Sequence, residues 1–191
     1  DDNFRNPQSI EFILPLKHKS SIHVRELPKD LKTAIEAFVL ANTMEDLMGL
    51  SDNHRSMLIN VSRFTAVQEE VSGLVNEYLK NIQSACKLYC KFPADKALQD
   101  IYIKQLKETF EVIYSNVDFE WEEVQTQLYN SCGSIMVQTI NQRNGQNLNY
   151  DDYPHGLRLI AVGGMSLSRG LTLEGLVISY FYRNSRMYDT L

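Results

Sequence analysis

The chain has 191 residues, 43% of them hydrophobic and 23% charged, which suits one medium-sized globular domain. Its net charge of −5 excludes a bulk attraction to nucleic acid or to an anionic membrane, so any nucleic-acid contact must come from a local basic strip. Three cysteines are too few for a disulfide framework, no apolar run could span a bilayer and no secretory signal is visible, so we expect a cytoplasmic protein without a membrane partner.

The first part of the chain predicts an irregular segment followed by a helix. Residues 1–27 form an extended or irregular entry segment in this interpretation, and Pro15 restricts any strand within it to a short or edge strand. From Leu31 to Met48 the apolar residues recur at helical spacing, directly after Pro28. We therefore place the start of the main domain at residue 28.

A strand, a tight turn and a long helix are predicted next. The run Met57–Val61 is apolar throughout, as buried parallel strands are, and Ser62 and Arg63 stand at its carboxyl end. Thr65–Gln68 matches the spacing of a capping box, and apolar residues then recur at helical spacing as far as Ile82.

The remainder alternates between helical and strand patterns. Residues 84–133 read as a helical insertion, and a loop rich in Asn and Gly follows at 141–156. Three further strands are predicted, at Ser134–Ile140, Leu157–Val162 and Leu176–Tyr182. The fold class is therefore α/β, with a mainly parallel sheet flanked by helices.

The stretch from Gly163 to Leu176 is the most informative one chemically. It follows a predicted strand, and ligands of open α/β sheets bind at the carboxyl ends of strands. Gly163 and Gly164 let the backbone approach a ligand closely, and Arg169 offers a fork of donors suited to phosphate. A glycine-rich turn with one surface arginine is the alternative interpretation of the same residues.

Two stretches resemble motifs of superfamily-two helicases. Ser168–Leu171 resembles motif five and Leu58–Arg63 resembles motif four, both of which belong to the second RecA-like lobe. The tail, Tyr180–Leu191, looks like the approach to motif six, and its last residues, Arg186–Leu191, read as the opening of a helix without a stop signal. We therefore expect residues 28–191 to be a RecA-like lobe, truncated before motif six, within a longer protein.

More closely, Met57–Thr65 and Gly163–Leu176 resemble the Z-one domain, and this resemblance extends from about Leu27 to Leu191. That family is described as an endonuclease module attached to superfamily-two helicase ATPases of bacterial defence and restriction-like systems. The resemblance implies a nucleic-acid-dependent ATPase of helicase or translocase type. ATP and Mg²⁺ would be cofactors of the intact protein, and DNA and the first RecA-like lobe would be partners of this chain.

The resemblance also implies roles for single residues. The second lobe closes over the nucleotide and grips the nucleic-acid backbone. The residues expected at nucleic-acid phosphates are Ser62, Arg63, Gly163 and Gly164. Those expected at the nucleotide between the lobes are Arg169, Gly170 and Thr172.

This sequence departs from the helicase pattern at two positions. Helicases usually have Thr where Gly164 falls, and Asp, which contacts the ribose, where Thr172 falls. No G-x-x-x-x-G-K-[ST] loop occurs in the chain. We therefore expect no catalytic residue, no bound cofactor and no ATP hydrolysis from this fragment alone.

Two alternatives stay open, a metal-dependent endonuclease module and a non-catalytic scaffold that binds a partner protein. Nucleases need clustered carboxylates, usually with a lysine, and Asp30-Leu31-Lys32 matches that pattern formally. Because Asp30 falls at a helix start, a stabilising N-terminal charge is the favoured interpretation. Cys86 and Cys90 would share a helix face, but they have no second pair of ligands, so no metal site is expected.

Overall fold

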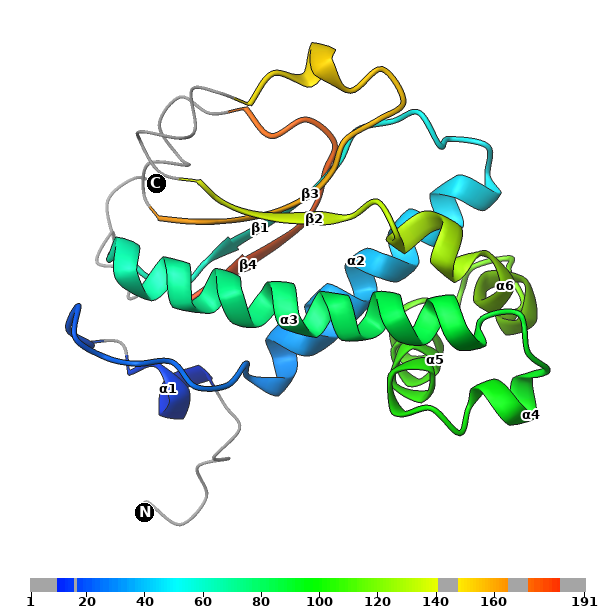
Figure 1. The fold of residues 1–191 in the computed structure, drawn as a ribbon, viewed down its shortest axis with the longest axis horizontal. Helices are drawn as coiled ribbons and strands as arrows, with labels where there is room; N and C mark the ends of the chain where they lie inside the picture. Colours follow the sequence, from blue (N-terminus) through cyan, green and yellow to red (C-terminus); the bar gives the residue numbers. More distant parts are fainter. Residues whose placement is uncertain (1–9, 16, 141–147, 165–171, 183–191) are drawn as a thin grey trace.

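One parallel sheet organises the structure, a computed structural model that describes residues 10–15, 17–140, 148–164 and 172–182 (Figure 1). Its strands are β1 (Arg55–Asn60), β2 (Met136–Ile140), β3 (Arg158–Gly163) and β4 (Leu176–Phe181). They lie in the order β2-β3-β1-β4, and every neighbouring pair is parallel. The predicted strands and the predicted α/β class with a parallel sheet are confirmed.

The helices agree with the sequence patterns except near the start. The predicted helices are α2 (Lys29–Leu47) and α3 (Thr65–Tyr89), followed by α4 (Ala94–Ala97), α5 (Ile101–Ile113) and α6 (Trp121–Cys132). In the entry segment, however, α1 (Ile10–Ile13) is a single helical turn where the sequence allowed only a short strand. The Leu14 amide donates to the Ile10 carbonyl, so this apolar run satisfies its backbone locally.

The two faces of the sheet are covered in different ways. Alternate residues of β1, such as Met57 and Ile59, join the core beneath α2 and α3. On the opposite face a smaller cluster forms around Leu58, and the described residues that cover it are Leu173 and several from 148–157. β1 is buried along its whole length as a result, which explains why its sequence is a continuous apolar run.

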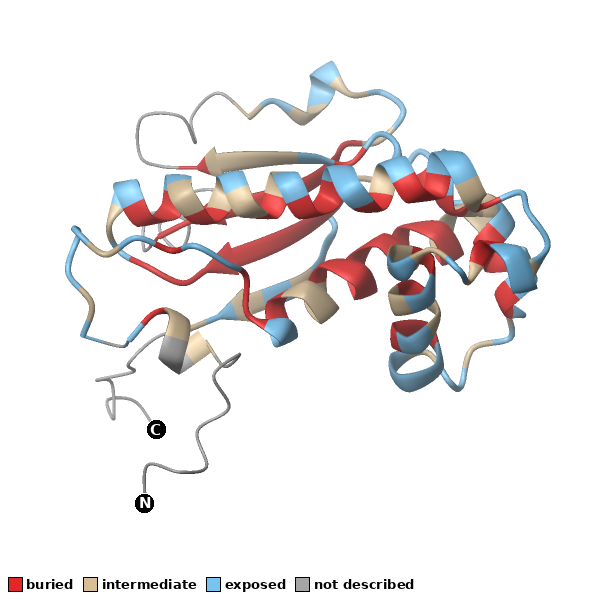
Figure 2. Ribbon diagram, turned by 60° about the horizontal axis from the view of Figure 1, so that its bottom comes forward, coloured by how far each residue is buried: buried red, intermediate tan, exposed pale blue. Residues whose placement is uncertain are grey.

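Helices α4–α6 extend the helical layer beyond the end of the sheet (Figure 2). They lie within the stretch that the sequence indicates as an insertion, residues 84–133. Ile103, Leu106 and Leu128 are completely buried in the same core as α2 and α3. The described part of the chain therefore has one continuous main core, and this stretch contributes to it.

A buried carboxylate joins three helices. The Tyr78 hydroxyl of α3 donates to Glu36 Oε1 of α2 at 2.5 Å, and the Thr109 hydroxyl of α5 donates to Glu36 Oε2. Burial, reinforced by the bond to Glu36, raises the pKa of Tyr78 well above its usual range. The phenol therefore stays a neutral donor, which a buried carboxylate requires.

The three cysteines are buried free thiols. Hydrogen bonding to Cys132, together with burial, raises the pKa of Cys86. Such thiols are poor nucleophiles and behave as small apolar side chains. Within the described residues, no helix has the length and hydropathy needed to cross a membrane.

Two buried arginines share one carboxylate at the amino ends of β1 and β3. Arg55 Nη1 lies 2.7 Å from Asp46 Oδ1, and Arg158 Nη1 lies 2.8 Å from Asp46 Oδ2. Glu45 completes the group through a 2.8 Å bond with Arg55 Nε. The arginines also donate to the carbonyls of Leu50 and Ser131, so the cluster fixes the end of α2 and the end of α6 to the sheet.

Replacing Asp46 by alanine should destabilise the protein strongly, because two buried guanidinium groups would lose their shared partner. The expected loss is about 3–5 kcal/mol in the free energy of unfolding, measured by equilibrium urea denaturation. As a control, Lys104→Ala removes an exposed ion pair with Glu108 on α5, and its cost should stay below about 1 kcal/mol. Equal costs for the two variants would contradict a stabilising role of Asp46.

Candidate functional site

The two motif stretches meet at the carboxyl edge of the sheet. β1 and β3 are direct neighbours with Ile59 opposite Val162, so the residues that follow each strand emerge side by side. The Asn60 amide donates to the Gly164 carbonyl at 3.3 Å and joins the two strand ends. Gly163 is the last residue of β3 and is buried there. The structure thus brings Ser62, Gly163 and Gly164 together. The sequence placed them at the ends of two strands but did not show that these strands are neighbours.

Gly164 is required by the close approach of two other groups. A Cβ on this residue would lie 2.5 Å from Gln68 Nε2 and 3.2 Å from the Ser62 carbonyl oxygen. Gln68 in turn donates to that same carbonyl at 2.9 Å. The space beside Gly164 is filled, so a side chain at this position would require Gln68 to move.

The hydroxyl of Ser62 is fully engaged. Its Oγ accepts from the Phe64 amide at 3.1 Å and lies 2.8 Å from His18 Nε2. His18 Nδ1 lies 2.8 Å from the Pro15 carbonyl, which can only accept, so Nδ1 carries the proton. His18 Nε2 of the neutral ring is then the acceptor, and Ser62 is the donor. This pairing keeps Ser62 buried, with 5% of its surface exposed.

Arg63 gives this edge an exposed positive charge. Its guanidinium carbon lies 4.8 Å from the centroid of the Phe64 ring, a cation–π contact that holds the side chain at the turn. Helix α3 begins two residues later, and its first turn has no acidic residue. The free amides and the dipole of the helix start add to the positive potential. The turn can therefore attract and bind an anion such as phosphate.

Of the remaining predicted residues, the structure describes only Thr172. Arg169 and Gly170 lie outside the described residues. Thr172 is exposed on the segment that leads into β4. The next residue, Leu173, packs on the second face of the sheet. The Glu174 carboxylate lies 3.9 Å from His54 at the amino edge.

Sequence reasoning missed three contributors to this edge. Asn60 and Gln68 join the strand ends, and His18 reaches Ser62 from a position 44 residues earlier in the chain. The predicted capping box is wrong, because α3 has Phe64 as its N-cap residue without a side-chain cap bond. Gln68 donates instead to the backbone of Ser62, and no local spacing rule describes that contact.

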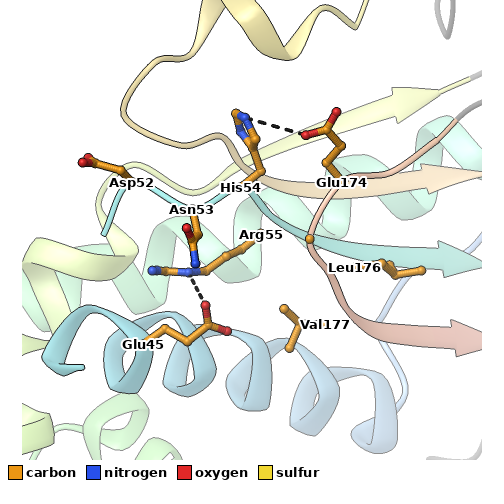
Figure 3. A pocket seen from close by; sticks show the side chains of 9 residues that line it. Glu45, Asp52, Asn53, His54, Arg55, Glu174, Leu176 and Val177 are labelled. Carbon is orange, nitrogen blue, oxygen red and sulfur yellow. Dashed lines mark hydrogen bonds and ion pairs between the residues drawn. The ribbon is translucent and has the colours of Figure 1, made fainter. Parts of the chain in front are cut away.

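A separate hollow lies at the opposite, amino edge of the sheet (Figure 3). Its lining residues are Glu45, Asp52, Asn53, His54, Arg55, Glu174, Gly175, Leu176 and Val177. Several of its polar groups serve the fold: Arg55 belongs to the buried ionic cluster, and His54 Nδ1 accepts from the Leu157 amide at 2.9 Å. None of the predicted site residues that the structure describes lines this hollow, so the carboxyl edge is the better candidate.

Asp30, the carboxylate of the nuclease pattern, has a structural partner. It lies in the first turn of α2, and its Oδ2 accepts from the Tyr180 hydroxyl at 2.8 Å. Burial and this bond raise the pKa of Tyr180. Asp30 therefore ties the start of α2 to β4. Across the described ranges, no three His, Cys, Asp or Glu side chains are placed to hold a metal ion.

Comparison with known proteins identifies one family. The family model of the Z1 domain matches residues 30–191, well over half of the chain. The curated proteins and the solved structures gave no significant match. The matched region includes both motif stretches at the carboxyl edge and leaves out the entry segment with His18.

The tight fit of Gly164 leads to a stability prediction. Gly164→Ala should cost about 1–3 kcal/mol of the free energy of unfolding, because the added methyl group displaces Gln68. Adding Gln68→Ala should recover part of that loss. Gly73→Ala is the matched control, since nothing lies within 4 Å of a Cβ at this helical position, and it should be neutral or stabilising. Urea denaturation midpoints of the four proteins test this, and no recovery on adding Gln68→Ala would refute the steric account.

Proposed function

Since the chain belongs to the Z1 domain family, we propose that it is the second, RecA-like motor lobe of a nucleic-acid-dependent ATPase of helicase or translocase type, acting in a bacterial defence or restriction-like system. The observation that supports this best is the meeting of Ser62-Arg63 and Gly163-Gly164 at one edge of a parallel sheet, beside the start of α3. That is the edge where ligands of open α/β sheets bind.

DNA is the proposed ligand of this edge. Arg63 offers an exposed guanidinium group, and the first backbone amides of α3 have no partner within the helix, so both suit backbone phosphates. In this proposal Gly163 and Gly164, which are buried at the end of β3, shape the edge that the DNA strand approaches. Contacts of this kind read the backbone and not the base sequence, as a translocating motor needs.

The nucleotide contact is proposed for the segment after Gly164. Arg169, Gly170 and Thr172 would face the first lobe, where Arg169 would orient and neutralise the nucleotide phosphates. ATP with Mg²⁺, held mainly by the first lobe, supplies the phosphoryl-transfer chemistry when bound. Because Gly164 interlocks with Gln68 and Ser62, a shift of this segment would reach the DNA-facing turn. Through this contact, movement of the segment when the lobes close would be transmitted to the turn that faces the DNA.

We do not extend the proposal to an endonuclease or to a non-catalytic scaffold. The carboxylate on which the nuclease alternative rests, Asp30, accepts a hydrogen bond from Tyr180 and stabilises the start of α2. No contact among the described residues favours either alternative over the motor lobe.

The proposal predicts that DNA stimulates ATP hydrolysis by the full-length protein and that Arg169→Ala lowers the stimulated kcat at least about 10-fold, because a donor to the developing phosphate charge is lost. Lys87→Ala, which removes one positive charge from the exposed far end of α3, is the control and should leave kcat unchanged. A steady-state ATPase assay with and without DNA measures both. Unchanged turnover in Arg169→Ala would overturn the role assigned to this residue.

A further inference from the structure

A basic loop from the entry segment borders the candidate DNA-facing edge. We call residues 17–23 the 17–23 loop. Leu14 before it and Val24 after it are buried in the core, so both ends are fixed. His23 Nδ1 lies 2.7 Å from Glu70 Oε1, and the Val24 amide donates to Glu70 Oε2 at 2.8 Å. These bonds fasten the loop to α3 near its start, and the pKa of Glu70 is lowered by the Val24 amide and by His23.

His18 joins the middle of the loop to the motif turn. A chain of hydrogen bonds runs from the Pro15 carbonyl through His18 to the Ser62 hydroxyl and on to the Phe64 amide. The His18 ring also meets the edge of the Phe64 ring, with 5.7 Å between centroids. The position of the loop relative to Ser62-Arg63 is thus set by several contacts at once.

These contacts place three exposed cations around one turn. Lys17 and Lys19 flank His18 and are exposed, and the exposed Arg63 directly follows Ser62, the partner of His18. In the described part of the chain no carboxylate forms an ion pair with any of the three. A protein with a net charge of −5 therefore has three exposed cations close to the start of α3, where the helix dipole adds a positive potential and the nearby Glu70 carboxylate is bound by His23 and by the Val24 amide.

We propose that the 17–23 loop is the second half of the DNA-backbone site, with Lys17 and Lys19 binding phosphates next to those bound at Arg63. His18 is a positioning residue, which holds the two lysines against the motif turn through Ser62 and Phe64. Lysine suits sequence-independent phosphate contact, and a loop that is already braced loses little conformational entropy on binding. The inference rests on the proposed function, and it concerns residues outside the region matched by the Z1 model.

The charge contribution can be tested by the salt dependence of DNA binding. The full-length protein and its Lys17→Gln/Lys19→Gln variant are titrated onto fluorescent single-stranded and duplex oligonucleotides, and anisotropy is followed over a series of salt concentrations. The slope of log K against log [salt] should become shallower by about 1–2 in the double variant, because each lysine releases close to one counterion. Lys104→Gln/Lys107→Gln on α5 removes the same charge elsewhere and should leave the slope unchanged.

The positioning role of His18 has its own readout. His18→Ala should weaken DNA binding several-fold in the otherwise unchanged protein, but should have no further effect in the Lys17→Gln/Lys19→Gln variant, because it acts through the lysines. His18→Gln, whose amide can both donate to Pro15 and accept from Ser62, should retain most of the affinity. A loss that is the same in both backgrounds would overturn the positioning role.

The outcomes separate this inference from the proposed function. Equal slopes for the two double-lysine variants would overturn the inference. If Arg63→Ala still weakened DNA binding in that case, the proposed function would stand without it. Absence of salt-sensitive DNA binding by the unchanged protein would overturn both.

Discussion

The shared carboxylate of Asp46 sets the alignment on which the rest of the structure depends. It binds Arg55 and Arg158, which begin adjacent strands and lie opposite each other in the sheet. Once one residue of β1 is aligned with one residue of β3, the register of the two strands sets every later residue pair. The alignment at the amino edge therefore determines which residues meet at the carboxyl edge. Ser62 and Gly164 are neighbours for this reason.

The two edges of the sheet consequently have different chemical characters. At the amino edge Arg55, Arg158 and Asp46 are buried and paired with one another, an arrangement that favours one alignment more than it adds net stability. At the carboxyl edge Arg63, Lys17 and Lys19 are exposed. The buried charges at the first edge favour one alignment of the strands, and the exposed charges at the second are available to a ligand.

The fold was largely predictable because β1 and β3 contain continuous apolar runs and the long helix α3 carries a regular apolar stripe. The contacts that build the candidate site could not be predicted from the sequence. Arg55 and Arg158 are the first residues of β1 and β3. A hydrophobicity pattern predicts that each strand begins at its first apolar residue, so it does not predict that an arginine before that residue is buried. The bond between His18 and Ser62 spans 44 residues without any periodic signal. The need for glycine at position 164 arises from Gln68, which local spacing had assigned to a capping box.

Hydrogen–deuterium exchange of the full-length protein, with and without DNA in the presence of a non-hydrolysable ATP analogue, tests the central claim most directly. The first amides of α3 have no partner within the helix and should exchange readily until a phosphate covers them. DNA is predicted to slow exchange in peptides covering residues 61–68, and to leave peptides covering residues 48–56 at the amino edge unchanged. Slower exchange confined to the amino edge would contradict the assignment of the carboxyl edge as the DNA-facing side.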